Sequence, residues 1–224
     1  MFEVRVADLK HYESEVRAYE SVPVQTGRIL FLGSSGFTRW RRVEGMFHDL
    51  EEDILRKDGS PAALNHGIGG STGEELLYYY DRLVRPYQPR ALVLRVVPND
   101  RYQGYHPHEI LFILSRLCAW ARTDFPGIKL YICDASPNLR NIGDACWLSH
   151  VQQFNTMLRD YCDKHDDTTC ICHTAFSGFY NDPADVGDYF KVRQDIFIQD
   201  NIHFNHEGYK LYRDMFLQAL NDIL

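Results

Sequence analysis

Short apolar runs alternate with amphipathic stretches along the whole chain. The runs, which contain many β-branched residues, cover 28–33, 62–68, 91–97, 129–135 and 168–174. Strands of this length, separated by helical patterns, are typical of βαβ units, in which helices cover both faces of a parallel sheet. The pattern therefore predicts an α/β fold with about five parallel strands.

The amphipathic stretches predict the helices that cover this sheet. Their apolar positions recur with helical spacing near 37–55, 73–84, 107–124, 145–164 and 206–223. A leading helix is expected over 7–20, whereas 174–202 shows no clear period. Long loops in compact domains are often functional. Because no repeat, low-complexity tract or linker interrupts the alternation, we expect residues 1–224 to form one domain.

The charge balance narrows the possible partners. Twenty-four basic residues against thirty-one acidic ones give a net charge of −7, without a compensating basic cluster. A protein that binds nucleic acid or anionic lipid is expected to have the opposite balance. We therefore expect a small neutral or modestly charged molecule as the partner, and no nucleic acid.

The N-terminal sequence and the cysteines indicate in which cellular compartment the protein is expected. The charged N-terminal stretch lacks the apolar core of a signal peptide, and no run is long enough to span a bilayer. The six cysteines show no CxxC pair, and several lie in apolar runs, where a free cysteine behaves as a small core residue. We expect a cytoplasmic protein without membrane insertion.

Polar clusters follow the strands at the positions where such a sheet binds ligands. In open α/β sheets, ligands bind at the carboxyl ends of the strands. Here Gly-Ser-Ser-Gly (33–36), a glycine-rich turn (67–73) and Val-Pro-Asn-Asp (97–100) follow the first three strands, and a polar segment (200–209) precedes the last helix. We expect these four blocks to meet at one edge of the sheet.

Together the blocks contain what a serine hydrolase needs: a hydroxyl nucleophile, an imidazole base, a group that orients the base, and donors for an oxyanion. Ser35 lies where a helix begins, and the helix dipole there favours negative charge. Asp200 and His203 can pair on one loop and leave the second ring nitrogen to face the serine. The N–H of Gly70 and the amide of Asn99 are candidate oxyanion donors.

These blocks resemble those of the SGNH hydrolase (GDSL esterase/lipase) superfamily, and the match runs through FLGSSGFTRW, LNHGIGGSTGEELLYYYDRLV and DNIHFNHEGY. The resemblance implies a three-layer α/β/α, flavodoxin-like fold, an acyl-enzyme mechanism, and no metal or other cofactor. It places the family's functional residues on this chain as follows: catalytic Ser35, His203 and Asp200, and an oxyanion hole of Ser35, Gly70 and Asn99.

Two positions depart from the commonest pattern of that superfamily. Ser34 replaces an aspartate, and Val97 replaces a glycine beside the expected site, which changes the shape of the pocket. Ser34 is interpreted as a turn residue. Because Pro98 disfavours a helical conformation of the residue before it, we expect Val97 to be extended and the strand to continue up to Asn99.

Each block also has a structural interpretation. Gly-Ser-Ser-Gly is commonly a turn in which serine caps the next helix. Asn99 after proline is a frequent turn former, and His203 could simply precede a helix capped by Asn205. Asp195 is an alternative carboxylate for orienting the histidine.

Three other clusters are less favourable candidates. His-Pro-His at 106–108 lacks a third zinc ligand at matching spacing. Cys-Ile-Cys-His at 170–173 places both cysteines on one face of a strand, which favours core packing. Gly-Ile-Gly-Gly at 67–70 lacks the Walker lysine and the dinucleotide fingerprint.

The sequence therefore predicts a serine esterase that hydrolyses small O-acyl esters, with acetyl or other short acyl groups, through an acyl-Ser35 intermediate. A lysophospholipase or thioesterase is the alternative enzyme, and it would need an apolar acyl groove. A non-catalytic ligand-binding relative is the alternative of another class, and it would be expected to lack part of the triad. The acyl acceptor and the oligomeric state stay open.

Overall fold

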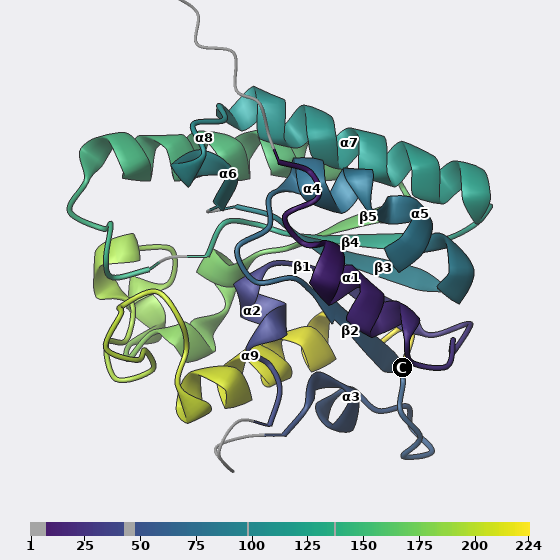
Figure 1. The fold of residues 1–224 in the computed structure, drawn as a ribbon. Coiled ribbons are helices and arrows are strands. Elements are labelled where there is room, and N and C mark those ends of the chain that lie inside the picture. The colour runs from purple at the N-terminus through teal and green to yellow at the C-terminus, as the bar shows by residue number, and fades with distance from the viewer. Residues whose placement is uncertain (1–7, 43–47, 98, 137) are drawn as a thin grey trace, which may run out of the picture.

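The sheet has five parallel strands in the order β2-β1-β3-β4-β5 (Figure 1). The strands are β1 Ile29–Gly33, β2 Ala63–Gly67, β3 Ala91–Arg95, β4 Lys129–Cys133 and β5 Thr168–Ile171. A computed structural model describes residues 8–42, 48–97, 99–136 and 138–224. This strand order is flavodoxin-like, so the predicted fold class is confirmed.

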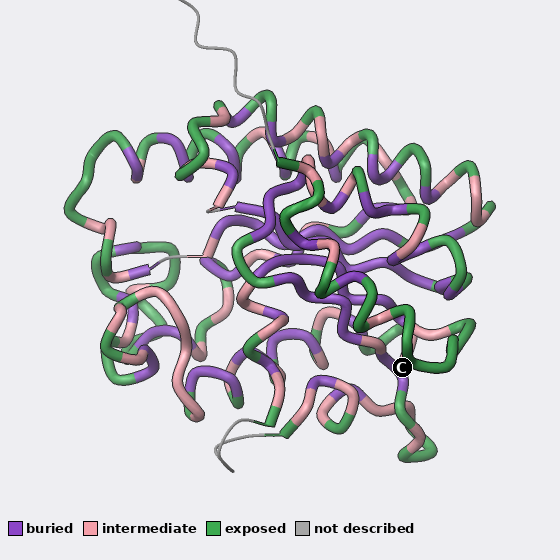
Figure 2. The backbone as a smooth tube through the Cα atoms, viewed as in Figure 1, coloured by how far each residue is buried: buried purple, intermediate pink, exposed green. Residues whose placement is uncertain are grey.

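Most strand residues are buried (Figure 2). Their side chains alternate between two hydrophobic cores, one on each face of the sheet. Leu30 and Leu32 of β1 pack into one core, whereas Ile29 and Phe31 pack into the other. This two-sided burial explains why the strands read as continuous apolar runs in the sequence.

Helices form the outer two layers (Figure 1). One core is shared with α1 Glu13–Glu20, α4 Gly73–Tyr78, α5 Tyr80–Leu83, α7 Pro107–Asp124 and α8 Ala145–Cys162. The other is shared with α2 Ser35–Thr38, α3 Leu50–Asp53 and α9 His206–Ala219. None of the helices in the described ranges is both long and apolar enough to cross a bilayer.

The helix expected over 37–55 is not continuous, so that prediction was wrong. The chain leaves α2 after Thr38 and folds back, so that the N–H of Leu50 donates to the carbonyl of Trp40 over 3.1 Å. Residues 43–47 lie outside the described ranges.

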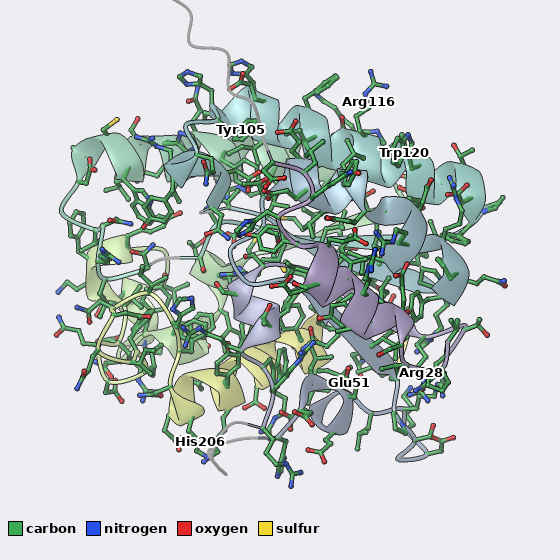
Figure 3. All side chains as sticks on the ribbon, viewed as in Figure 1. Arg28, Glu51, Tyr105, Arg116, Trp120 and His206 are labelled. Atoms are coloured by element: carbon green, nitrogen blue, oxygen red, sulfur yellow. The ribbon has the colours of Figure 1, made fainter. Side chains whose placement is uncertain are left out.

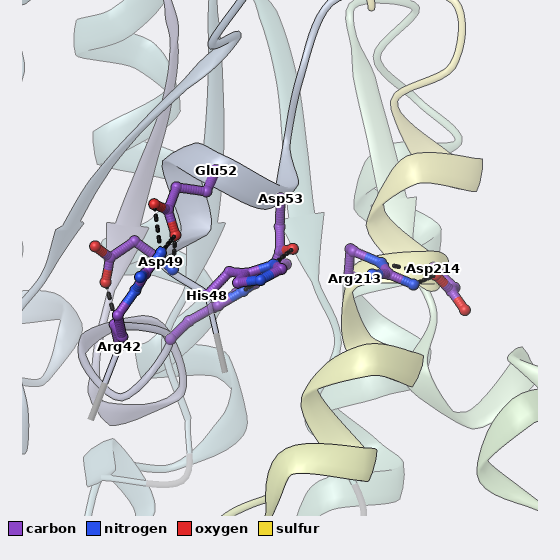
Figure 4. A network of polar contacts seen from close by, with 8 residues as sticks. Arg42, His48, Asp49, Glu52, Asp53, Arg213 and Asp214 are labelled. Atoms are coloured by element: carbon purple, nitrogen blue, oxygen red, sulfur yellow. Dashed lines mark hydrogen bonds and ion pairs between the residues drawn. The ribbon is translucent and has the colours of Figure 1, made fainter. Parts of the chain in front are cut away.

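Local polar contacts give α3 its separate start (Figure 4). The Glu52 carboxylate accepts from the N–H of Asp49 over 3.1 Å and pairs with the Arg42 guanidinium over 2.6 Å. A side chain that satisfies the first N–H groups of a helix fixes where that helix begins. The apolar spacing across 37–55 therefore belongs to two short helices.

Other boundaries differ by less. The helix expected over 73–84 is divided into α4 and α5 at Tyr79, and α9 ends at Ala219. The segment 174–202 contains short 3-10 turns. The first turn begins at His173, so β5 ends at Ile171 and is shorter than the apolar run 168–174. These turns are η2 His173–Ala175, η3 Ser177–Phe179, η4 Pro183–Asp185 and η5 Tyr189–Lys191.

Two strand-end glycines let α2 approach the sheet closely. Gly33 and Gly67 are opposite each other in the β1–β2 register. A Cβ atom on Gly67 would lie 2.5 Å from the backbone nitrogen of Thr38, and one on Gly33 would lie 2.6 Å from the Arg95 carbonyl oxygen. Any side chain at either position would displace backbone.

We expect Gly67→Ala to lower the free energy of unfolding by about 1–3 kcal/mol, because the added methyl group overpacks the contact with Thr38. Urea unfolding measures this change. Gly143→Ala is the matched control, since a Cβ there meets nothing within 4 Å, and it should change stability by less than about 0.5 kcal/mol. Equal effects of the two changes would contradict the packing argument.

Candidate active site

Ser35, His203 and Asp200 form a continuous chain of hydrogen bonds. The Nε2 atom of His203 lies 2.9 Å from the hydroxyl oxygen of Ser35, and its Nδ1 atom lies 2.6 Å from Asp200 Oδ2. Ser35 is the first residue of α2 and is separated from the end of β1 only by Ser34, whereas the other two lie on the loop before α9. The fold brings together residues that are 168 positions apart.

Asp200 is fixed as a carboxylate. Its Oδ1 atom accepts hydrogen bonds from the backbone N–H groups of Ile202 and His203, both over 2.9 Å. Burial favours the neutral acid, but the bonds from the His203 ring and from these two N–H groups outweigh it and lower the pKa of Asp200 to about 2. The carboxylate is therefore charged at neutral pH and holds Nδ1 as the protonated ring nitrogen.

The His203 imidazole is shifted toward its neutral form. Partial burial lowers its pKa, Asp200 opposes this shift, and the positive charges of Arg39 and Arg95 add to it. A neutral ring with a proton on Nδ1 leaves Nε2 as an acceptor for the Ser35 hydroxyl proton. The geometry thus suits general-base activation of a serine.

Gly70 and Asn99 line the same cavity as Ser35 and His203. Gly70 has φ +85°, a left-handed conformation that glycine adopts without strain. The side-chain amide of Asn99 donates to the carbonyl of Ser71 over 3.0 Å, next to Gly70. An amide has two N–H groups, so this bond fixes the side chain and leaves a second donor.

Val97 is not extended, so the straight run into Asn99 was a wrong expectation. Its φ is +64°, and β3 ends before it, at Arg95. The buried carboxylate of Asp100 accepts from the N–H of Val97 over 3.0 Å and from that of Gly73 over 2.8 Å. Asp100 thus holds the third block against the start of α4, and this tie accounts for the conformation of Val97.

The structure tests whether Ser34 and Asn205 cap the helices that follow them. Ser34 precedes α2 at its N-cap position, but its side chain makes no cap bond, and its hydroxyl is buried without a partner among the described residues. Asn205 does cap α9, by accepting from the N–H of Gly208 over 3.0 Å. Asp195 pairs with Arg193 over 2.6 Å, and the carboxylate at His203 is that of Asp200.

The cavity has a volume of about 340 Å³. The polar residues in its lining that were not singled out from the sequence include Arg39, Arg95, Ser136 and Asn138. Arg95 ends β3, and the signal for it was a single arginine inside the apolar run 91–97. A charged residue within a strand buried on both faces is unusual enough to mark a functional position.

A second histidine–carboxylate pair lies behind this cavity. His173 and Asp134 have fully buried side chains, and His173 Nδ1 lies 2.7 Å from Asp134 Oδ1. The His173 ring stacks on Tyr212, a lining residue of the cavity, with 5.4 Å between ring centroids. Because the imidazole Nε2 is buried without a partner in the described ranges, this pair does not contact a nucleophile.

The remaining clusters show no metal-site geometry. The His106 and His108 rings stack with centroids 5.8 Å apart, and no group of three or more potential metal ligands converges in the part of the chain that the structure describes. Cys170 and Cys172 are half-buried, with 3.4 Å between their sulfur atoms, and Cys170 packs against the edge of the core shared with α8.

Comparison with known proteins identifies the family. The sequence model of the GDSL-like lipase/acylhydrolase family matches residues 31–211, which contain all four blocks. The chain therefore belongs to this family of acylhydrolases, and the resemblance seen in the sequence is confirmed. No match was found among curated protein sequences.

Solved structures share the fold at low sequence identity. A GDSL-like lipase from Bacteroides thetaiotaomicron VPI-5482 is similar with a TM-score of 0.70 and 19% identity, over 97% of this chain and 98% of that one. An acetyl xylan esterase is similar with a TM-score of 0.68 and 18% identity, over 86% and 99%. TesA is similar with a TM-score of 0.66 and 16% identity, over 88% and 100%.

The lowered pKa of His203 predicts the pH dependence of an ester hydrolysis that uses this base. We expect kcat/KM to rise with pH through a midpoint below 6.5, the ordinary value for imidazole, because the base must be neutral in the free enzyme. A pH profile with a neutral ester measures the midpoint. Arg39→Gln should move it upward, since a positive neighbour is removed. A wild-type midpoint above 6.5 would contradict the assignment.

Proposed function

We propose that this protein is a serine esterase that hydrolyses O-acyl esters of small alcohols through an acyl-Ser35 intermediate. The observation that carries the proposal is the hydrogen-bonded chain from Asp200 through His203 to the Ser35 hydroxyl, at the wall of a cavity. The family supports ester hydrolysis in general. A non-catalytic relative would have no need of an intact chain of this geometry.

In the first half-reaction, the Ser35 oxygen attacks the ester carbonyl carbon while His203 Nε2 takes the hydroxyl proton. The carbonyl π electrons move onto oxygen, and the resulting oxyanion accepts hydrogen bonds from the N–H groups of Ser35 and Gly70 and from the Asn99 amide. The intermediate then collapses. The bond to the alcohol oxygen breaks, and that oxygen takes the proton from His203.

In the second half-reaction, water replaces the alcohol. His203 takes a proton from the water as its oxygen attacks the acyl carbon, and the same donors stabilise the second oxyanion. Collapse breaks the bond to Ser35 Oγ, which recovers its proton from His203. The products are a carboxylic acid and free enzyme. Asp200 stays ionised throughout and stabilises the imidazolium.

A second, larger cavity favours a longer acyl group as the alternative substrate. Its volume is about 640 Å³, and it shares Thr38 and Gly69 with the catalytic cavity. Its apolar lining includes Tyr19, Leu64, Ile68 and Tyr87. Arg28 and Glu51, labelled in Figure 3, also line it. A chain that extends from the catalytic cavity past Thr38 would enter an apolar groove of the kind a lysophospholipase or thioesterase requires.

We expect Ser35→Ala to abolish hydrolysis of 4-nitrophenyl esters, because the attacking oxygen is lost, while the protein remains folded. Ser34→Ala is the matched control, since it removes the neighbouring hydroxyl, which contacts no described polar group. It should keep most activity. Assays from acetate to octanoate separate the two substrate classes: a decline in kcat/KM beyond butyrate indicates a short-chain esterase, and a rise indicates use of the larger cavity. Equal losses in both serine variants would refute the nucleophile assignment.

Asn99→Ala tests the oxyanion hole. An amide that donates to the developing oxyanion contributes mainly in the transition state, so kcat should fall by about 10²–10³, equivalent to about 2.7–4 kcal/mol, with little change in KM. Steady-state kinetics and thermal unfolding are measured on the same variant. A destabilised but fully active protein would assign Asn99 only the bond to the Ser71 carbonyl.

A further inference from the structure

Arg95 is a buried cation in the wall of the catalytic cavity. It is 8% exposed, and its Nη2 atom donates to the Ser136 hydroxyl over 3.0 Å. A Cβ atom on Gly36 would lie 2.4 Å from Arg95 Nη1, so the guanidinium packs directly against the residue that follows Ser35. Its Nε atom is buried without a hydrogen-bond partner among the described residues. The guanidinium therefore has unused donor capacity beside the nucleophile.

No carboxylate of the described ranges forms an ion pair with Arg95. Burying an unpaired charge is costly, so buried cations are normally paired. The buried carboxylate of Asp134 is already occupied by the ring and N–H of His173 and by the Thr174 hydroxyl. A buried arginine with a free donor and no anionic partner is a position at which a bound anion would be stabilised.

The other charged residue that lines the cavity is also positive. Its described lining residues include Arg39 and Arg95 and no aspartate or glutamate, whereas the whole chain has a net charge of −7. The larger cavity differs, because its lining contains four carboxylates (Glu15, Asp49, Glu51 and Glu52) against two arginines (Arg28 and Arg41). The charged side chains that line the cavity where the ester bond would be cleaved are thus both cations, and the carboxylate of Asp200 lies behind the His203 ring and is paired with it.

The position of the charges indicates which part of the substrate they face. Arg39 and Arg95 are the cations whose charge acts on the His203 imidazole. His203 Nε2 must donate its proton to the departing alcohol oxygen, so the alcohol part of the ester occupies the space beside this ring. Asn138 and Ser136 supply neutral polar groups in the same lining.

We propose that Arg95, assisted by Arg39, binds a negatively charged group, a carboxylate or a phosphate, on the alcohol part of the ester. The proposal rests on the proposed esterase function and adds a substrate class to it: acyl esters of small anionic alcohols. Arg95 is thus proposed to determine substrate specificity. The bound anion would form the ion pair that no carboxylate of the described residues forms with Arg95.

Three esters of matched shape test the preference: 3-acetoxybenzoate, 3-acetoxyphenyl phosphate and the neutral 3-acetoxybenzamide. A charge-assisted hydrogen bond predicts that kcat/KM for an anionic ester exceeds that for the amide by about 10- to 100-fold. The two anionic esters distinguish carboxylate from phosphate. Similar wild-type kcat/KM values for all three would overturn the proposal.

Arg95→Met should reduce this ratio to near one, and Arg95→Lys should keep part of it. Arg116→Gln is the matched control, because it makes the same change in net charge at an exposed position on α7, away from the cavity lining (Figure 3). It should keep the wild-type ratio. A role for Arg95 only in oxyanion stabilisation would slow all three esters equally and leave the ratio unchanged, which would also overturn the proposal.

Two further measurements keep the test independent of folding and of turnover. If Arg95→Met does not fold, Arg39→Gln at the exposed neighbour should still lower the anionic-to-neutral ratio, and an unchanged ratio counts against the proposal. Titration of 3-acetoxybenzoate and 3-acetoxybenzamide into Ser35→Ala protein gives the ratio of Kd values without hydrolysis. Equal Kd values refute anion binding, whereas hydrolysis that persists in Ser35→Ala refutes the esterase mechanism instead.

Discussion

The arrangement of the site depends on one packing constraint at the ends of β1 and β2. Both strands finish in glycine: the missing Cβ of Gly67 lets the backbone of α2 rest directly on the end of the sheet, and that of Gly33 makes room for the Phe37 ring of α2 and the Arg95 carbonyl of β3. Ser35 is the first residue of that helix, so its height above the sheet is set by the contact between Gly67 and Thr38. Because β1 lies between β2 and β3, Ser35 emerges between the loops that carry Gly70 and Asn99. This is also the point at which the strand order reverses, where open α/β sheets bind ligands.

The protonation of His203 is a balance between groups that favour its charged form and groups that favour its neutral form. Asp200 favours the charged imidazolium, while burial and two arginines favour the neutral form. A general base must be neutral before the reaction and becomes charged during it. Burial and the two arginines thus favour the neutral ring needed before the reaction, and Asp200 favours the charged ring formed during it. The carboxylate is in direct contact with the ring, whereas the arginines lie in the cavity lining, where a bound anion would offset their charge. An anionic substrate would therefore also make protonation of His203 easier once it is bound.

The sequence predicted the fold and the candidate site best where polar blocks with reactive side chains adjoin regular apolar runs. The five strands were predicted because burial on both faces produces continuous apolar runs, and the four blocks were found because each follows a strand or precedes a helix. Two polar contacts that set the local backbone conformation were not predictable in the same way. The tie from Asp100 to Val97 overrides the preference imposed by Pro98, and the contact between Asp49 and Glu52 divides an apparently continuous helix. Arg95 was visible as an irregularity, but its meaning depends on a cavity that only the fold creates.

The helix α1 precedes the region matched by the family model, yet it lines the larger cavity beside the candidate site. Its residue Tyr19 donates to the carbonyl of Gly67 over 2.6 Å and lines the larger cavity, and Arg82 on α5 binds both Glu13 and Glu20. The helix is thus anchored at its two ends, Val16 between them is buried in the core, and Glu15 and Ala18 form a face that lines the larger cavity. Substitutions along that face can alter the dimensions of the cavity without disturbing any of the four blocks. The dimensions of the larger cavity can therefore be altered through α1 independently of the contacts that hold Ser35, His203 and Asp200 together.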